Sequence, residues 1–152
     1  MTFETRKIEM MQMVEMTKRN SSGSGVCTVE TKEPLILMVE DELILLELFK
    51  YKFRHLPYRF ESRDNGWDGL KAIYELKPDL VILDLMIPGL PGKSLLKELR
   101  SNNEIDQPKV LVVSSKNSER DVDDIYSLGA DDYVGKPFLL NEMLARIERL
   151  LK

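Results

Sequence analysis

Three runs of consecutive large aliphatic residues, each ended by polar side chains, constrain this chain more than any other feature of its sequence. The runs cover residues 35–39, 80–83 and 110–113, and they lead into Glu40-Asp41-Glu42, Asp84 and Ser114-Ser115. Continuously apolar runs of this length are typical of strands buried on both faces of a parallel sheet. Because ligands bind at the carboxyl ends of such strands, we expect a functional site where these polar residues gather.

Length and composition favour one domain in the cytoplasm. The 152 residues are enough for a single domain with a sizeable core. The 26 acidic and 22 basic side chains give a net charge of −4, which argues against the basic surface that nonspecific nucleic-acid binding needs. No run approaches the roughly 18 consecutive apolar residues of a membrane span, and no signal peptide is recognisable. Lone Cys27 cannot form an internal disulfide, which suits a reducing compartment. We therefore expect no direct contact with nucleic acid or membrane.

The first 34 residues differ in composition from the rest of the chain. Residues 1–20 place Phe3, Ile8 and Met10 loosely at helical spacing, which predicts an amphipathic N-terminal helix. An added leader sequence is the alternative, because Ser-Ser-Gly-Ser-Gly at residues 21–25 resembles an engineered linker. Residues 21–34 are predicted to form a flexible linker, and the main domain is expected over residues 35–152.

Predicted strands and helices alternate from residue 35 onward. Strands are expected at 35–39, 58–62, 80–83, 110–113 and 132–134, and helices at 42–55, 67–76, 93–101, 119–128 and 139–151. The first helix of this domain is expected to present Leu45, Leu48, Phe49 and Phe53 as its apolar face. Strands 1, 3 and 4 are continuously apolar whereas 2 and 5 are not, which favours 2 and 5 at the edges. The pattern predicts an α/β fold, a flavodoxin-like (βα)5 doubly wound parallel sheet with strand order 2-1-3-4-5 and right-handed crossovers.

Polar residues at the predicted strand ends form a set suited to phosphoryl transfer. The carboxylates of Glu40, Asp41 and Asp84 would converge and repel one another, which calls for a compensating cation. Oxygen ligands suit Mg²⁺, which binds one or two carboxylates together with phosphate oxygens. Lys136 offers a fixed positive charge that would pair with Asp84 or with a phosphate, and Ser114 offers a hydroxyl donor. Asp84 is the candidate nucleophile, because carboxylates form aspartyl-phosphate intermediates.

Residues 35–152 resemble the receiver domain of two-component response regulators, in the CheY-like superfamily. Four stretches carry the resemblance, in the family's order and close to its spacing: LILMVEDE, PDLVILDLMIPGLPG, VLVVSSK and GADDYVGKPF. The resemblance implies a signalling domain and not an enzyme. Such a domain catalyses only its own phosphorylation and dephosphorylation. It also implies that the phosphoryl group comes from a sensor histidine kinase or a phosphotransfer protein.

The resemblance assigns the acceptor and the metal ligands. Asp84 would be the phosphoacceptor, and Mg²⁺ would be held by Glu40, Asp41, Asp84 and the backbone carbonyl of Met86. The alternative for Glu40 and Asp41 is that they cap the helix that follows them. Glu40 stands where the family more often has Asp. Met86 puts an apolar side chain two residues past the acceptor, which predicts poor positioning of the hydrolytic water and a long-lived phosphate.

The resemblance also assigns a switch and a phosphate ligand. Ser114, in place of the more usual Thr, would be the switch hydroxyl, and Tyr133 the aromatic side chain that reorients with it. Lys136 would bind the phosphate, with a cis peptide bond between Lys136 and Pro137. As alternatives, Ser114 is a helix N-cap, a role for which Ser118 is better placed, and Tyr133 is ordinary edge-strand packing.

The resemblance predicts that phosphorylation changes the surface formed by residues 119–151. As Ser114 moves toward the phosphate, Tyr133 would fill the vacated space. That surface carries a charge pattern resembling regulators that form homodimers through it: Asp131, Asp132, Glu142 and Arg146. Because no DNA-binding or catalytic output domain follows before Lys152, we expect either a stand-alone receiver or part of a longer regulator.

Three rival functions are compatible with this fold. A phosphorylation-independent pseudo-receiver scaffold is disfavoured by the intact set of site residues. A Mg²⁺-dependent phosphohydrolase of the haloacid dehalogenase type needs a second Asp two residues after the nucleophile, where this chain has Met86. An FMN-binding flavodoxin needs a Ser/Thr/Gly-rich phosphate loop after the first strand, where Glu40-Asp41-Glu42 would repel phosphate.

Overall fold

The structure, a computed structural model, describes residues 2–18, 32–115 and 118–152. Most of the predicted linker at 21–34, together with Cys27, lies outside these residues. Within the described part of the chain, no helix combines the length and the apolar composition needed to cross a membrane.

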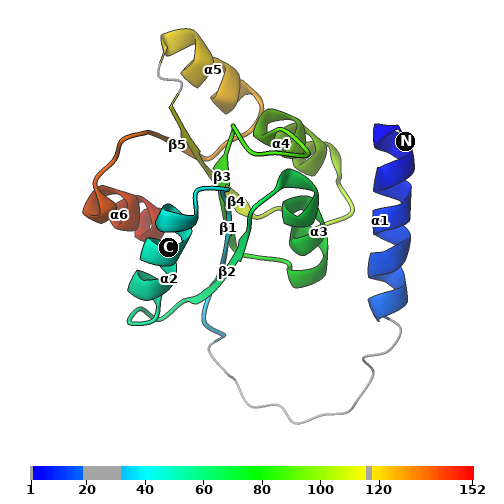
Figure 1. The fold of residues 1–152 in the computed structure, drawn as a ribbon, viewed down its shortest axis with the longest axis horizontal. Coiled ribbons are helices and arrows are strands. Elements are labelled where there is room, and N and C mark those ends of the chain that lie inside the picture. Colours follow the sequence, from blue (N-terminus) through cyan, green and yellow to red (C-terminus); the bar gives the residue numbers. More distant parts are fainter. Residues whose placement is uncertain (1, 19–31, 116–117) are drawn as a thin grey trace.

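Five parallel strands form one sheet, with helices between them (Figure 1). The strands are β1 (Leu35–Val39), β2 (Arg59–Arg63), β3 (Leu80–Asp84), β4 (Lys109–Ser114) and β5 (Asp132–Gly135). The helices are α1 (Phe3–Lys18), α2 (Leu43–Phe53), α3 (Gly66–Leu76), α4 (Gly92–Ser101), α5 (Glu119–Ser127) and α6 (Leu140–Leu150). The sheet order is β2-β1-β3-β4-β5, which confirms the predicted 2-1-3-4-5 topology.

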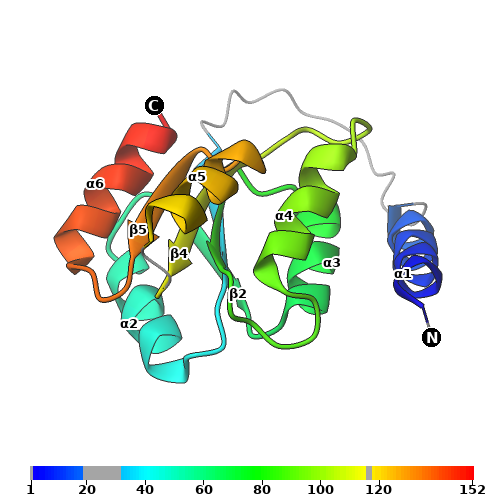
Figure 2. The same ribbon diagram turned by 90° about the horizontal axis from the view of Figure 1, so that it is seen from above.

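Helices cover both faces of the sheet, and a separate apolar core fills each interface (Figure 2). One core packs α2 and α6 against Ile36, Met38 and Ile82. The other packs α3 and α4 against Leu37, Val39 and the opposite side of β3. Because successive strand residues point to opposite faces, the central strands have to be apolar throughout, which explains their uninterrupted runs. β2 lies at the edge and is only partly buried.

The inward face of α2 differs from the prediction at two residues, because Leu46 takes the buried place expected for Leu48. Leu46, Phe49 and Phe53 are buried, whereas the predicted core residue Leu48 is 44% exposed. Residues 46, 49 and 53 follow the 3.6-residue helical repeat toward the sheet, and position 48 falls outside that stripe. The sequence is apolar around most of this helix, so its composition alone does not identify the buried face. Leu43 and Ile44 are consequently also exposed.

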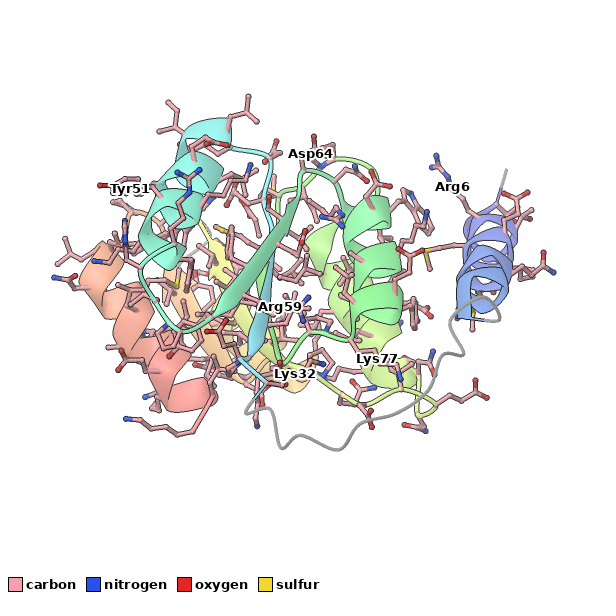
Figure 3. The ribbon with its side chains drawn as sticks, turned by 90° about the horizontal axis from the view of Figure 1, so that it is seen from below. Arg6, Lys32, Tyr51, Arg59, Asp64 and Lys77 are labelled. Atoms are coloured by element: carbon pink, nitrogen blue, oxygen red, sulfur yellow. The ribbon has the colours of Figure 1, made fainter. Side chains whose placement is uncertain are left out.

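Helix α1 lies outside the doubly wound unit, next to α3 (Figures 1 and 3). A helix is therefore present within residues 1–20, although its apolar and polar residues are not separated into two clear faces. Contact with the rest of the protein comes from a few side chains, among them Met10, which is 8% exposed and joins the core on the α3–α4 side of the sheet.

Candidate functional site

The carboxyl ends of β1, β3, β4 and β5 bring the predicted site residues together. Parallel pairing aligns Val39 with Leu83, so Glu40 and Asp84 follow aligned positions on neighbouring strands. Ser114 pairs with Gly135, immediately before Lys136. Residues separated by up to 96 positions in the chain therefore meet at one edge, as expected for a parallel α/β sheet.

Lys136 bridges two buried carboxylates. Its Nζ atom lies 2.7 Å from Oε2 of Glu40 and 2.7 Å from Oδ2 of Asp84. Glu40 is 1% exposed and Asp84 6% exposed, so water screens these ion pairs weakly. The sequence predicted that Lys136 would pair with Asp84 or a phosphate, but it did not predict the simultaneous bond to Glu40.

A backbone amide donates a hydrogen bond to the second oxygen of each buried carboxylate. The Met86 N–H donates to Oδ1 of Asp84 at 2.8 Å, and the Glu42 N–H donates to Oε1 of Glu40 at 3.2 Å. Glu42 itself occupies the N-cap position of α2 and makes no side-chain capping bond. Neither Glu40 nor Asp41 is therefore the N-cap residue of α2.

Among the residues that the structure describes, the site carries more negative than positive charge. Burial raises the pKa of Glu40, the bond from Lys136 opposes this shift, and the neighbouring Asp84 charge adds to it. Burial on its own lowers the pKa of Lys136, but its bonds to Asp84 and Glu40 outweigh burial and the net shift is upward. Asp41 adds a third, exposed carboxylate, and oxygens of all three residues lie within 4.8 Å of one another. This all-oxygen donor set fits a hard divalent cation such as Mg²⁺.

Two glycines hold the loop that follows Asp84 against the rest of the site. A Cβ atom on Gly92 would lie 2.3 Å from the backbone oxygen of Asp84, and one on Gly66 would lie 1.9 Å from that of Leu90. The Gly66 N–H also donates to the Pro88 carbonyl at 2.9 Å. Such a close approach joins segments that are far apart in the chain, so the sequence pattern alone does not reveal it.

The predicted switch residues lie beside the acidic cluster. Ser114 is fully buried at the end of β4, and its carbonyl accepts a 2.8 Å bond from the Lys136 N–H. Tyr133 is half-buried, with its hydroxyl 3.4 Å from the same carbonyl. Ser118, not Ser114, is the N-cap of α5, as predicted, and the Lys136–Pro137 peptide bond is cis.

An apolar groove of about 410 Å³ borders the site, which the sequence analysis did not identify. It is lined by Leu45, Leu48, Phe138 and Leu140, and it reaches Lys136. The exposed side chains of Leu43, Ile44 and Leu139 extend the apolar surface beyond it. The available sequence signal was the number of apolar residues on α2, which exceeds what one buried face needs. The sequence analysis assigned the apolar residues at helical spacing, Leu48 among them, to the core.

Comparison with known proteins identifies a family model that matches most of the chain. The model describes a response regulator receiver domain, and it matches residues 36–148. The match begins within β1 and ends within α6, so it covers the whole sheet and excludes α1.

Solved receiver-domain structures have the same fold. The receiver domain of Francisella response regulator 1452 is 30% identical, with 78% of this chain and 96% of that chain covered and a TM-score of 0.73. The BeF3-activated N-terminal receiver domain of Klebsiella pneumoniae RstA is 28% identical, with 78% and 98% covered and a TM-score of 0.71. The receiver domain of sensor histidine kinase PA1611 from Pseudomonas aeruginosa PAO1, solved with a magnesium ion in its active-site cleft, is 22% identical, with 79% and 98% covered and a TM-score of 0.70.

Proposed function

The chain belongs to the response regulator receiver domain family, and from this membership we propose that Asp84 accepts a phosphoryl group from a histidine kinase or phosphotransfer protein. Receiver domains are signalling domains that act with sensor histidine kinases and output domains. The observation that carries the proposal is the buried Glu40–Lys136–Asp84 arrangement, because it presents a carboxylate nucleophile beside a fixed ammonium group.

The chain's own groups account for the transfer step. A carboxylate oxygen of Asp84 attacks phosphorus, an acyl phosphate bond forms, and the P–N bond of a phosphohistidine donor breaks as its imidazole takes up a proton. Lys136 is already 2.7 Å from Asp84 and would bind an oxygen of the incoming phosphoryl group. The Met86 N–H holds the acceptor carboxylate in a fixed orientation.

We assign Mg²⁺ to the carboxylates of Glu40, Asp41 and Asp84 and to the Met86 backbone carbonyl. Three carboxylates facing one ammonium group leave an excess of negative charge, which opposes the approach of a phosphoryl group. A divalent cation bound there would neutralise that excess and stabilise the charge that develops during transfer.

A protein donor would dock on the apolar surface beside the site. The exposed residues Leu43, Ile44 and Leu139 adjoin in sequence the residues that line the groove leading to Lys136, and such an apolar surface suits the apolar face of a donor helix. We expect Ile44→Asp to slow transfer from a phosphohistidine protein and to leave phosphorylation by acetyl phosphate unchanged. Equal loss with both donors would contradict a docking role.

The phosphate would then act through Ser114 and Tyr133 on the surface formed by α5, β5 and α6. We propose that this surface mediates homodimerisation after phosphorylation. The charged residues named for that role are all engaged within the chain, since Arg146 bonds both Glu142 and Asp132, while Arg100 and Lys109 bond Asp131. A dimer would therefore have to retain or exchange these ion pairs. Sedimentation of the beryllofluoride-treated protein tests this, and a monomer in both states would contradict it.

The decisive experiment measures the intact mass after incubation with acetyl phosphate and Mg²⁺. We expect one added phosphoryl group in the wild type, none in Asp84→Asn, and none when Mg²⁺ is chelated. Asp68→Asn is a matched control, because Asp68 is exposed and lies in the first turn of α3. If neither a phosphoryl adduct nor beryllofluoride binding is detected in the folded wild type, the proposal is wrong and a phosphorylation-independent scaffold is favoured.

A further inference from the structure

Helix α1 contacts two helices of the receiver domain through residues spaced along one side. The Arg6 guanidinium lies 5.3 Å from the ring centroid of Trp67 on α3. The Lys7 ammonium lies 2.5 Å from Oε1 of Glu98 on α4. Met10, which lies i+3 from Lys7 and i+4 from Arg6, is buried against the same side of the domain. Figure 3 shows α1 beside α3 on this side, with Arg6 labelled.

These contacts combine charge with apolar burial. The bond to Glu98 is the main cause of a raised pKa at Lys7, which means that the ion pair stabilises the charged ammonium. A guanidinium group near an indole adds a cation–π attraction. Because the family match begins at residue 36, the contact belongs to a segment of this chain that lies outside the receiver domain itself.

Trp67 connects the docked helix to the phosphoacceptor loop. A Cβ atom on Gly89 would lie 3.1 Å from Cδ1 of Trp67, so the indole rests directly against the loop backbone. The adjacent Gly66 donates a hydrogen bond to the Pro88 carbonyl. Movement of this loop would consequently disturb the surface on which Arg6 rests. The same loop begins at Met86, whose N–H orients Asp84.

We propose that α1 is a cis-acting regulatory helix that docks on α3 and α4, stabilises through Trp67 the conformation that the 86–91 loop has in this structure, and so opposes its rearrangement on phosphorylation. The docking itself is independent of the proposed function, whereas the coupling to phosphorylation rests on it. Linkage requires the effect to be reciprocal, so phosphorylation of Asp84 weakens the docking of α1 by the same factor by which docking disfavours phosphorylation.

The docking is tested by reversing its ion pair in the full-length chain. Lys7→Glu places two carboxylates together, Glu98→Lys places two ammonium groups together, and the double variant restores the pair. Acrylamide quenching of Trp67, the only tryptophan in the chain, and amide exchange in residues 3–12 report docking without any phosphate. We expect both single variants to increase quenching and amide exchange. The double variant should return both to the wild-type values.

The matched control is Gln12→Ala, an exposed substitution on the same helix. If Lys7→Glu and Glu98→Lys behave like this control, the docking is wrong. The measurements are repeated at two protein concentrations, because protection of Trp67 that increases with concentration would show α1 docking on a second copy and overturn the cis arrangement.

The coupling is tested by the rate of phosphorylation from acetyl phosphate. We expect Lys7→Glu to react about fivefold faster than the wild type, at the lower end of allosteric coupling, and the double variant to return to the wild-type rate. If quenching shows that α1 is released and the rate does not change, the coupling is wrong and only docking remains. If no variant is phosphorylated, the proposed function and the coupling both fail, and the quenching result still decides the docking.

Discussion

In the described part of the chain, buried carboxylates pair with cations in two clusters whose charge balances differ. At the candidate site, Lys136 is the one cation among the described residues that pairs with the carboxylates of Glu40 and Asp84. Near the end of the chain, the single carboxylate of Asp132 is bound by both Arg146 and Arg149, at 2.9 Å and 2.6 Å. Among the described residues, the first cluster is short of positive charge, whereas in the second two arginines balance Asp132 and the neighbouring Glu142.

This difference separates a site that can take up a ligand from one that is complete. A buried carboxylate with two guanidinium partners has its charge compensated and most of its hydrogen-bonding capacity used. The Asp132 cluster therefore contributes to stability and specificity of the fold. At the strand ends, the remaining negative charge requires a further cation, and three carboxylates with one lysine supply the oxygens to bind it. Buried charge by itself does not identify a functional site, but uncompensated buried charge does.

The largest expected effect concerns Lys136, which pairs with both buried carboxylates of the acidic cluster. Replacing Lys136 by Met removes the positive charge beside Asp84, so we expect phosphorylation by acetyl phosphate to slow about 10²-fold. Intact mass against time gives the rate. Lys93→Met is the control, because that lysine makes only a 3.7 Å pair with the exposed Asp124. A normal rate in Lys136→Met would mean that the ammonium group has no role in the transfer.

The complementary change removes the buried carboxylate of the Asp132 cluster. Asp132→Asn keeps the side-chain shape but leaves Arg146 and Arg149 without their acceptor charge, and we expect a loss of about 1–3 kcal/mol in the free energy of unfolding. Phosphorylation should persist. Urea unfolding measures the change, with Arg149→Ala as the control. Because Arg149 is 65% exposed, its removal should cost less than about 1 kcal/mol. Equal losses would contradict the role of Asp132 as the buried centre.

A third prediction concerns the side chain that borders the acidic cluster. Met86 is 62% exposed two residues past Asp84, and it offers no group to orient water. We expect Met86→Glu and Met86→Asn to accelerate dephosphorylation about tenfold, equivalent to 1.36 kcal/mol in the barrier. Loss of the phosphoryl mass after gel filtration measures this rate. Leu139→Glu controls for a new acidic group on an exposed apolar residue, and an unchanged rate in the Met86 variants would contradict the prediction.

The smallest expected effect is the pH dependence of the stability that Tyr126 contributes beside the Asp132 cluster. Burial, followed by the charge of Asp132, raises the pKa of Tyr126 above its ordinary value of 10.0, while Arg146 and Arg149 oppose the shift. The native state therefore retains this proton longer than the unfolded state. The resulting stability is present below pH 10.0 and is lost as the pH rises through the native pKa.

Tyr126→Phe removes this contribution. We expect the stability difference between the wild type and Tyr126→Phe to shrink as the pH passes above 10.0, as measured by urea unfolding about one pH unit below and above that value. Other alkaline transitions, including that of Tyr133, cancel in the difference. A difference that stays constant with pH would show that the pKa of Tyr126 is not raised in the native state.

The sequence alone was enough to predict the strand order of the sheet and the residues of the acidic site. Continuous apolar runs identified the central strands, and the polar residues after them identified one edge, because strand-end positions in parallel sheets converge whatever their separation in the chain. Edge placement of the second strand followed from its alternating pattern. The N-cap role of Ser118 and the turn at Asn65 also follow from local chemistry, in which a side chain bonds its own neighbouring backbone.

Only the tertiary structure decided which groups share a partner. Three interactions join distant segments of the chain. They are the bond from Lys136 to Glu40, the pairing of Asp132 with two arginines, and the contact of α1 with Trp67 and Glu98. The exposure of Leu48 likewise depended on which side of an almost wholly apolar helix meets the sheet. Periodicity and capping act within a few residues and can therefore be read along the chain, whereas charge pairing depends on distances that exist only after the elements have packed.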